Sequence, residues 1–486
     1  MYRKMITLLG VVFSIVTFAQ KQNGVTFSSN NTDLNNAFEW AKNKALYYAH
    51  DDSDPVGFWY EAALPNREAF CMRDVSHQSI GAEILGLSKH NFNMFLKFAQ
   101  NISEEKDYCS WWEINRYNKP APVDYENDKD FWYNLPANFD VVYNTGRLYR
   151  WTGNLNYLQH PDLQNFYKLS LNEYVDRWEL GFDKVLARER DMHLVKPENG
   201  KLRFGNKRGI PTYNEGGRGE TLLSIDLTAS LIAAYKAYAD ILRLNGKETE
   251  SEKMAKLAQM EQQFLTDFWW DAKKGEFKSI LYVDNSYDYF MVGNNQAFQH
   301  YVLYFNALSD KEKISTVVND YIANYKKLIV ELKSYLPIIF YENGHSDRAT
   351  KMIVELCSQE NKRRDYPENS FTIIEHITRG LMGIEGYAEH KMVQTYSRLD
   401  KESDWAEIRD ISILGTRISV KHNGHSKTTL TNHGNIEILW NVNLKKCGPQ
   451  VLVNGIKTQV FSAKEGEYSF TTVKVPAGET VVVSTI

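Results

Sequence analysis

The sequence predicts a mainly α chain, in which a toroid of helical hairpins is followed by a small antiparallel β-sandwich. Two observations predict this fold class. Between residues 32 and 385, apolar residues recur at helical spacing in about a dozen stretches, with few strand patterns between them. After Glu389, short runs typical of strands are separated by Gly or Asn turns instead.

The first helix is predicted by Leu34, Phe38, Ala41, Ala45 and Tyr48, which fall on one helical face. Further helices are expected at Val75–Leu87, Asn91–Gln100, Ala137–Trp151, Leu163–Trp178, Ser224–Leu244, Glu250–Phe268, Asn295–Leu308, Lys311–Tyr325, Lys327–Phe340, Asp347–Cys357 and Phe371–Met382. Long loops join some of them, at Asp51–Arg73, Asp107–Pro136 and Val195–Thr221. Since long loops in compact domains are usually functional, we expect them to gather on one face of the ring and to hold the site.

The strands are expected at Ile411–Leu414, Arg417–His422, Lys427–Asn432, Asn435–Asn441, Gln450–Val453, Lys457–Phe461, Tyr468–Val475 and Thr480–Val483. Asn454–Gly455 is a hairpin signal. This number of short strands in about ninety residues is typical of a β-sandwich. We therefore expect a helical domain over residues 20–392 and a sandwich over residues 393–486, with Val393–Trp405 as the hinge.

The N-terminus predicts the compartment. Arg3 and Lys4 precede an apolar run, Ile6 to Phe18, and small residues follow near a cleavage position at Ala19. This pattern is typical of a secretory signal peptide, residues 1–19. The run is shorter than the roughly 20 residues that a bilayer span needs. We expect a secreted or periplasmic protein with no membrane span.

Composition and motifs limit the partners. The net charge is −4 without any block of like charge, so no nucleic-acid partner is expected. The four cysteines lack metal-ligand spacing, and no zinc motif, nucleophile elbow or dinucleotide fingerprint occurs, so no metal and no cofactor are expected. The aromatic content of 13% suits an oligosaccharide partner, because aromatic faces stack on sugars. The sequence does not indicate an oligomeric state.

Four segments contain candidate site residues. The first runs from Gly57 to Gln78 and places Arg73, Asp74 and His77 at the start of a helix, after aromatic residues that include Tyr60. Arg and Asp together offer donors and acceptors in a fixed geometry, which suits adjacent sugar hydroxyls. The alternative is that Asp74 simply caps the helix.

The second segment holds Trp111 and Trp112 in a polar loop, followed by an acidic cluster (Asp124, Glu126, Asp128 and Asp130) that is more typical of solvated surface. At least one of the two tryptophans is expected to face solvent or ligand. The cluster does not fit a calcium loop of the EF-hand type.

The third segment, residues 210–220, packs Tyr213, Asn214, Glu215 and Arg218 between glycines that let backbone approach a ligand. Its alternative is a simple turn before the next helix. The fourth contains Glu375 and His376 in an apolar helix, where burial would raise the pKa of a carboxyl toward acid–base use. Its alternative is an exposed pair of Glu375 with Arg379. Asn294, Asn295, Gln296 and His300 form a weaker polar cluster.

Taken in order, these features resemble the six-hairpin glycosidase superfamily, the (α/α)6 toroid enzymes with a C-terminal β-sandwich. Arg73-Asp74 is similar to the Arg-Asp pair of its glucoamylase-like and rhamnosidase-like members, which reads the terminal sugar or takes part in catalysis. Leu148-Tyr-Arg-Trp-Thr-Gly-Asn154 is similar to their helix-end motif, with Asn154 in place of Asp. The resemblance implies an exo-acting enzyme with a pocket for a non-reducing terminal sugar, usually working by inversion.

Three functions follow as hypotheses. The first is a glycoside hydrolase in which Glu215, or else Asp74, protonates the leaving oxygen and Glu375 activates water, while Arg73, Arg218 and Trp111 or Trp112 hold the sugar. The second is a lyase or dehydratase that eliminates at C4–C5 of a terminal uronic acid, with bases drawn from Tyr213, His77, His300 and His376, assisted by Asn214 and Arg218. The third is a non-catalytic glycan-binding protein.

Overall fold

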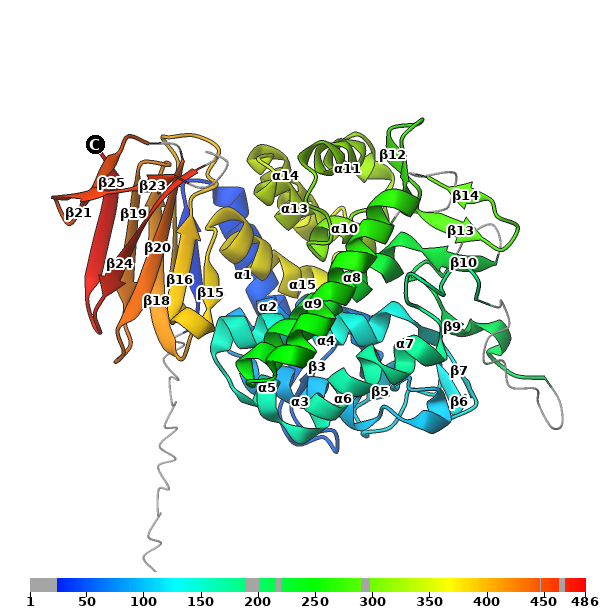
Figure 1. Ribbon diagram of the computed structural model, residues 1–486. Helices are drawn as coiled ribbons and strands as arrows, with labels where there is room; N and C mark the ends of the chain where they lie inside the picture. Colours follow the sequence, from blue (N-terminus) through cyan, green and yellow to red (C-terminus); the bar gives the residue numbers. More distant parts are fainter. Residues whose placement is uncertain (1–23, 189–200, 216–219, 290–297, 446, 463–467) are drawn as a thin grey trace, which may run out of the picture.

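The computed structural model describes residues 24–188, 201–215, 220–289, 298–445, 447–462 and 468–486. A helical domain and a strand-built domain lie side by side in it (Figure 1). The fold class is the predicted one, a helical toroid with a small C-terminal sandwich of largely antiparallel strands. The expected signal peptide, residues 1–19, lies outside the described residues.

An inner ring of helices surrounds the centre of the toroid. Successive members pack on one another from α15 through α2, α4 and α8 to α10, and α13 packs on the π-helix η5 that continues α15. Their bounds are α2 Met72–Ile84, α4 Pro136–Thr152, α8 Ile225–Leu244, α10 Tyr301–Tyr304, α13 Leu336–Glu342, α15 Pro367–Glu375 and η5 His376–Leu381. These helices are buried on most sides, and α2 buries even its polar residues.

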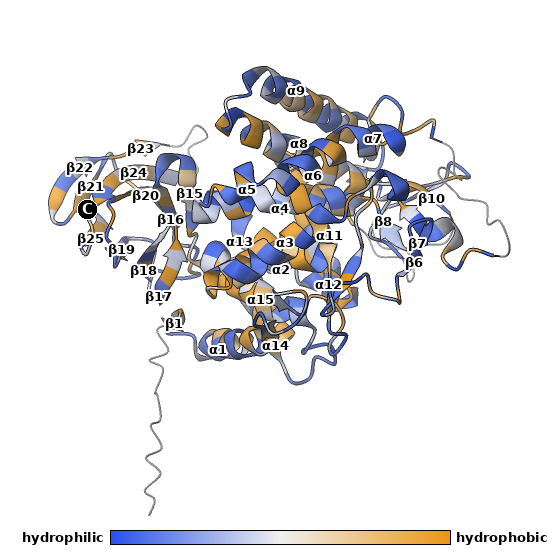
Figure 2. Ribbon diagram, turned by 90° about the horizontal axis from the view of Figure 1, so that it is seen from below, coloured by the Kyte–Doolittle hydropathy of each residue, from blue (hydrophilic) through white to orange (hydrophobic). Residues whose placement is uncertain are grey.

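An outer ring covers the inner one. Its helices are α1 Thr32–Tyr47, α3 Ser88–Gln100, α6 Pro161–Leu171, α9 Glu248–Phe264, α11 Lys311–Asn324 and α14 Ser346–Cys357. They are two-faced: α14 buries Ala349, Met352, Ile353 and Leu356, which follow helical spacing. Figure 2 shows the same mixture of polar and apolar residues on α1, α9 and α14. Their apolar stripes are why the sequence predicted them.

The helix boundaries differ from expectation at a few places. Proline at the second position of α13 begins a new helix, so the expected helix 327–340 is divided into α12 (Val330–Lys333) and α13. The expected helix 163–178 divides into α6 and α7 (Glu173–Arg177). Of the expected helix 295–308, the structure describes only α10 as helical, while residues 290–297 lie outside it.

The sandwich contains two sheets. The first has the strand order β1-β17-β18-β19-β25-β21-β22, with bounds β1 Thr26–Ser29, β17 Trp405–Ile413, β18 Thr416–Asn423, β19 Lys427–Asn432, β25 Thr480–Thr485, β21 Gln450–Val453 and β22 Ile456–Gln459. The second has the order β15-β16-β20-β24-β23, with bounds β15 Glu385–Tyr387, β16 Met392–Tyr396, β20 Ile438–Lys445, β24 Tyr468–Val475 and β23 Phe461–Ser462. The predicted hairpin joins β21 to β22, with φ of 49° at Asn454 and 83° at Gly455.

Two strands of these sheets lie outside the expected sandwich range 393–486. β1 precedes the first helix and pairs with β17, with Thr26 opposite Arg409. β15 follows η5 directly and pairs with β16. The expected hinge, Val393–Trp405, contains most of β16 and the first residue of β17. Along the chain, strands of the sandwich therefore both precede and follow the helices of the toroid.

Short strands hold the long loops at one end of the toroid. β4 (Ala69–Cys71) leads directly into α2 and pairs with β5 (Glu113–Asn115). β8 (Tyr133–Asn134) stands before α4 and pairs with β9 (Arg208–Ile210), while β10 (Thr221–Ser224) leads into α8. The described parts of the three long loops thus meet near the N-termini of α2, α4 and α8, as the sequence predicted. No helix in the described segments is both long and apolar enough for a bilayer span.

Candidate active site

A cavity of about 930 Å³ lies where the long loops meet. It brings together six of the residues that the sequence singled out: Arg73, Asp74, Trp112, Tyr213, Asn214 and Glu215. It adds residues that the sequence analysis did not assign to a site, among them Arg67, Glu113, Glu331 and Tyr366, and it includes Asp124 of the acidic cluster. We call it the loop pocket.

Asp74 lies in the first turn of α2, and its carboxylate already accepts hydrogen bonds from neighbouring side chains. The N-cap residue is Cys71, so the alternative of Asp74 as a helix cap does not describe the structure. The Cys71 thiol and the Tyr366 hydroxyl both donate to Asp74. Burial raises the pKa of Asp74, while the nearby Arg73 guanidinium opposes that rise. Asp74 is thus a fixed acceptor at the pocket wall.

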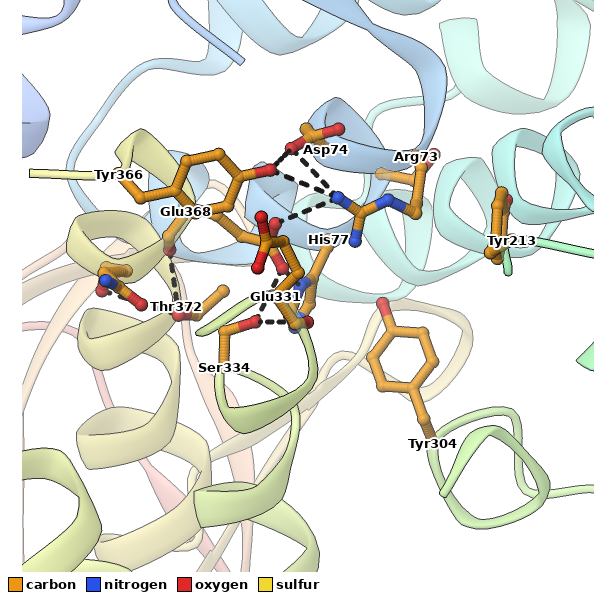
Figure 3. A network of polar contacts seen from close by, with 12 residues as sticks. Arg73, Asp74, His77, Tyr213, Tyr304, Glu331, Ser334, Tyr366, Glu368 and Thr372 are labelled. Atoms are coloured by element: carbon orange, nitrogen blue, oxygen red, sulfur yellow. Dashed lines mark hydrogen bonds and ion pairs between the residues drawn. The ribbon is translucent and has the colours of Figure 1, made fainter. Parts of the chain in front are cut away.

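The Arg73 guanidinium is anchored by one of its nitrogens. Nη2 lies 3.2 Å from Asp74 Oδ1, 3.2 Å from the Tyr366 hydroxyl and 3.4 Å from Glu368 Oε2. Figure 3 shows these contacts on one side, and the remaining nitrogens on the side of Tyr213 and Tyr304. A guanidinium that is held at one end and keeps further N–H groups is suited to donate to a ligand in a fixed direction.

Glu368, which contacts Arg73 Nη2, is itself held in place by buried neighbours. Its carboxylate is completely buried and accepts from the Ser334 hydroxyl at 2.6 Å, and it hydrogen-bonds to His77 Nδ1. The His77 ring stacks on Tyr335 with centroids 3.4 Å apart, and burial holds the pKa of His77 well below its ordinary value. His77 is therefore neutral and does not line the loop pocket. It belongs to the framework that fixes Glu368.

Glu113 and Asp124 form a coupled carboxyl pair in the pocket wall. Arg67 Nε lies 2.9 Å from Glu113, and Arg67 Nη2 lies 3.4 Å from Asp124. Burial, followed by hydrogen bonding to Asp124 and the charge of Asp124, raises the pKa of Glu113 to about 9. Burial also raises the pKa of Asp124. Since two adjacent carboxyls cannot both ionise cheaply, the pair shares one proton.

The segment around Tyr213 is fixed by two buried carboxyls. The backbone N–H of Tyr213 donates to Asp226 at 2.7 Å, and its hydroxyl donates to Asp140 at 3.0 Å. Burial raises the pKa of Asp226 to about 6 and that of Asp140 to about 7, although hydrogen bonds to both oppose the rise. Burial also places the pKa of Tyr213 well above its ordinary value, so its hydroxyl remains a neutral hydrogen-bonding group.

Glu215 lies at the exposed edge of the loop pocket, on a different loop from Glu113. Although its surface is exposed, loss of hydration beside the surrounding protein raises the pKa of Glu215, and the Arg73 guanidinium opposes this rise. Asn214 lines the pocket beside it. Arg218 lies outside the described residues, as do Asn294, Asn295 and Gln296.

Glu375 is not part of the loop pocket. Its buried carboxylate accepts from Arg147 of α4 and from Arg379 one turn further along its own helix. Burial alone would raise the pKa of Glu375, but the two guanidinium groups lower it to about 2. The pairing with Arg379 that the sequence offered as an alternative is present, although it is buried and not exposed. A carboxylate with so low a pKa is a weak base.

The other residues named from the sequence pack in the core around the pocket. Tyr60 is completely buried and donates to Asn91 at 2.8 Å. His300 hydrogen-bonds to the Tyr321 hydroxyl at 3.0 Å, and His376 to the Ser334 carbonyl at 2.6 Å. Trp111 packs edge-on against Tyr125. None of these four lines the loop pocket.

The residues missed by the sequence analysis gave weak signals. Glu113 follows Trp112 directly, but one carboxylate in a polar loop does not reveal burial. Glu368 follows a proline at a helix start, where an acidic residue is ordinarily explained by the helix dipole. Within the described segments, no group of His, Cys, Asp and Glu side chains has the arrangement of a metal site.

Comparison with known proteins shows the fold. No protein-family model matches the chain, and no curated protein matches it in sequence. A rhamnosidase of Bacillus sp. GL1 matches 82% of the chain with a TM-score of 0.55 at 10% identity, and an α-L-rhamnosidase of Dictyoglumus thermophilum matches 95% with a TM-score of 0.56 at 13% identity. A structure described as a sialidase matches 82% with a TM-score of 0.54 at 12% identity.

These matches confirm the predicted architecture, a helical toroid with an attached sandwich. The chain spans 40%, 50% and 38% of the length of these three structures, respectively. At such identities the likeness concerns the fold alone.

Proposed function

We propose that this protein is an exo-acting glycoside hydrolase that removes a terminal sugar from an oligosaccharide. One observation carries the proposal: a single pocket contains the buried carboxyl of Glu113 beside that of Asp124, where burial raises the pKa of Glu113, together with the separate carboxyl of Glu215. Glycoside hydrolysis needs both an acid that protonates the leaving oxygen and a carboxylate that activates water or attacks the sugar.

Glu113 is the general acid in this proposal. Its pKa of about 9 keeps the proton available, and Asp124 and Arg67 hold the carboxyl in place. Glu215 is the general base, because it stands on another loop and is exposed to solvent at the edge of the pocket. Glu113 replaces Glu215 as the acid because the Glu113 carboxyl is the buried one. An inverting mechanism requires about 6.5–9.5 Å between the two carboxyls.

The sugar is held by the remaining pocket residues. Arg73 and Asp74 supply donors and an acceptor from one helix turn, which suits two neighbouring hydroxyls. Trp112 offers an aromatic face, and Tyr213 offers a neutral hydroxyl. The toroid fold is found in the rhamnosidases and the sialidase named above, and the proposed activity is in keeping with theirs.

The elimination hypothesis has no observation in its favour. A tyrosine base needs a lowered pKa, whereas burial raises the pKa of Tyr213 well above its ordinary value. Of the three histidines considered for that role, none lines the loop pocket. Hydrolysis is therefore the reaction that we propose.

The test incubates the purified protein with a panel of neutral and uronate-containing oligosaccharides and follows the products by mass spectrometry and ultraviolet absorbance. We expect products that gain one water and show no absorbance from a new C4–C5 double bond. Glu113→Gln is expected to lower kcat by about 10²–10⁴-fold. Glu105→Gln, an exposed glutamate that precedes the same loop, is the matched control and should retain full activity. Products that absorb without gaining water would replace hydrolysis by elimination.

We also propose that the protein acts outside the cytoplasm, on the basis of the signal-peptide pattern at residues 1–19. N-terminal sequencing of protein recovered from the periplasm or medium of an expressing bacterium is expected to begin near Gln20. Full-length protein retained in the cytoplasm would contradict this proposal.

A further inference from the structure

A second cavity, of about 380 Å³, lies at the other end of the inner helices. It is lined by the C-terminal halves of α4 and α8 and by the segment that joins β15 to β16. The residues that matter here are Tyr149, Arg150, Lys236, Asn306 and Tyr387. Its volume is within the range of small-ligand sites.

This cavity is separate from the loop pocket. Asp140, which holds Tyr213 of the loop pocket, and Arg150 are both on α4, about 15 Å apart along the helix axis at ~1.5 Å per residue. Asp226 and Lys236 are separated by a similar distance of about 15 Å along α8. The two cavities have no lining residue in common. A ligand in one does not occupy the other.

The cavity contains more positive charge than its carboxylates neutralise. Of its four Arg and Lys side chains, Arg147 is paired with Glu375, and Arg243 is paired with Glu389 at 2.6 and 2.9 Å. Asp240, which also lines the cavity, lies 3.6 Å from Arg243 as well. Within the described residues, Arg150 and Lys236 form no ion pair with any carboxylate.

The contacts of these two cations are with neutral groups. Arg150 lies over the ring of Tyr387 at 5.5 Å, and Lys236 donates to the backbone carbonyl of Asn306 at 3.1 Å. Burial lowers the pKa of Lys236 with no opposing carboxylate. Arg150 lies in the last turn of α4, where the helix dipole stabilises a positive charge. Lys236 lies in the middle of α8, where the helix dipole does not stabilise its charge. An anion that enters the cavity would meet both.

We propose that this cavity binds an anionic sugar unit, one that carries a carboxylate or a sulfate group. Arg150 and Lys236 take the anionic group, which they can approach from two different helices. Tyr149 and Tyr387 supply aromatic surface and hydroxyls to the sugar ring, and Asn306 adds a further polar group. Neither the site nor its ligand depends on the proposed hydrolase activity.

The experiment is isothermal titration calorimetry of the full chain with glucuronate, glucose 6-sulfate, glucose and inorganic sulfate. We expect binding of at least one anionic sugar, weaker binding of inorganic sulfate and no binding of glucose. Arg150→Gln and Lys236→Gln should each weaken that binding by about tenfold or more, since each removes a charge-assisted hydrogen bond. Comparison of glucuronate with glucose 6-sulfate shows whether the cavity recognises a carboxylate or a sulfate group.

The matched variant is Arg73→Gln in the loop pocket, which should leave this binding unchanged. Both cavity variants should keep the wild-type Tm, because Arg150 is exposed and Lys236 is partly exposed. Affinity that falls in Arg73→Gln but not in the cavity variants would place the ligand in the loop pocket and overturn the inference. Equal affinity for glucose, equal affinity for inorganic sulfate, or no binding of either anionic sugar would also overturn it.

Discussion

At the scale of single residues, the Glu113–Asp124 pair determines how activity should depend on pH. A general acid works only while it is protonated, so activity is lost as pH rises through its pKa. The pKa of Glu113 is raised to about 9, first by burial and then by the hydrogen bond and charge of Asp124. We therefore expect an alkaline limb in the pH profile of kcat/KM near pH 9.

Asp124→Asn tests the origin of that limb. The substitution removes the charge that helps raise the pKa of Glu113, so Glu113 ionises at lower pH. The alkaline limb should move toward acid by about one unit or more. Initial rates measured between pH 5 and pH 10 on the best oligosaccharide substrate give the shift directly.

Arg67→Met is the complementary variant, because Arg67 lowers the pKa of Glu113 and its removal should move the limb toward alkali. Unchanged limbs in both variants would remove Glu113 from the role of general acid, even if Glu113→Gln is inactive.

Candidate site residues could be predicted from the sequence where a reactive side chain stood at an unusual position in a helix. Arg73 and Asp74 were found because an Arg-Asp pair opened a helix after an aromatic loop. Glu375 was chosen because it stood in an apolar helix, and it is indeed buried. Its partner Arg147 is on another helix, remote in sequence, so the sequence could not show that the charge was already neutralised.

At the scale of elements, helices with an exposed face were easier to predict than buried ones. The outer helix α14 shows its apolar stripe directly. The inner helix α2 buries Asp74, Ser76, His77, Gln78 and Glu83, so its polar pattern resembles that of a surface helix. Its boundaries were nevertheless within a few residues of those expected. The environment of its polar side chains depended on the ring closing around them.

The ion pairs of Glu375 join two inner helices, α4 and α15. Glu375→Gln leaves the Arg147 guanidinium without its carboxylate, while Arg379 keeps its ion pair with Glu385 at 2.6 Å. We therefore expect the free energy of unfolding to fall by about 3–5 kcal/mol. Thermal unfolding followed by circular dichroism at pH 7 measures this as a lower Tm. Any loss of activity should follow the loss of folded protein.

The effect of pH on this variant has a definite sign. The pKa of Glu375 is lowered from 4.5 to about 2 by Arg147 and Arg379. Its contribution is therefore complete above about pH 4.5 and is lost as pH falls through about 2. The Tm difference between wild type and Glu375→Gln should shrink over this interval. Glu252→Gln, at an exposed position on α9, should match the wild type throughout. A difference that stays constant would assign the destabilisation to packing.

At the scale of the whole molecule, the two domains are joined by more than the chain between them. β1 precedes the toroid and completes the sheet edge on β17. Trp151 at the end of α4 donates to the Ser412 carbonyl at 3.0 Å, and Arg398 donates to the Gly380 carbonyl at 2.8 Å. The expected division at residue 393 treated the domains as consecutive, because pairing of β1 with a strand far along the chain leaves no local signal.

These contacts predict that the toroid and the sandwich unfold together. Differential scanning calorimetry should show one transition whose calorimetric and van't Hoff enthalpies agree.

Gly386→Ala probes the junction, because a Cβ there would come within 2.9 Å of the Arg150 carbonyl and 3.1 Å of the Trp151 Cα. Backbone atoms cannot move aside as a flexible side chain does, so we expect a loss of about 1–3 kcal/mol. The single transition should move to lower temperature as a whole. Gly448→Ala, where a Cβ meets nothing within 4 Å, should leave it in place. A transition that splits in two, with only one part shifted, would mean that each domain is stable without the other.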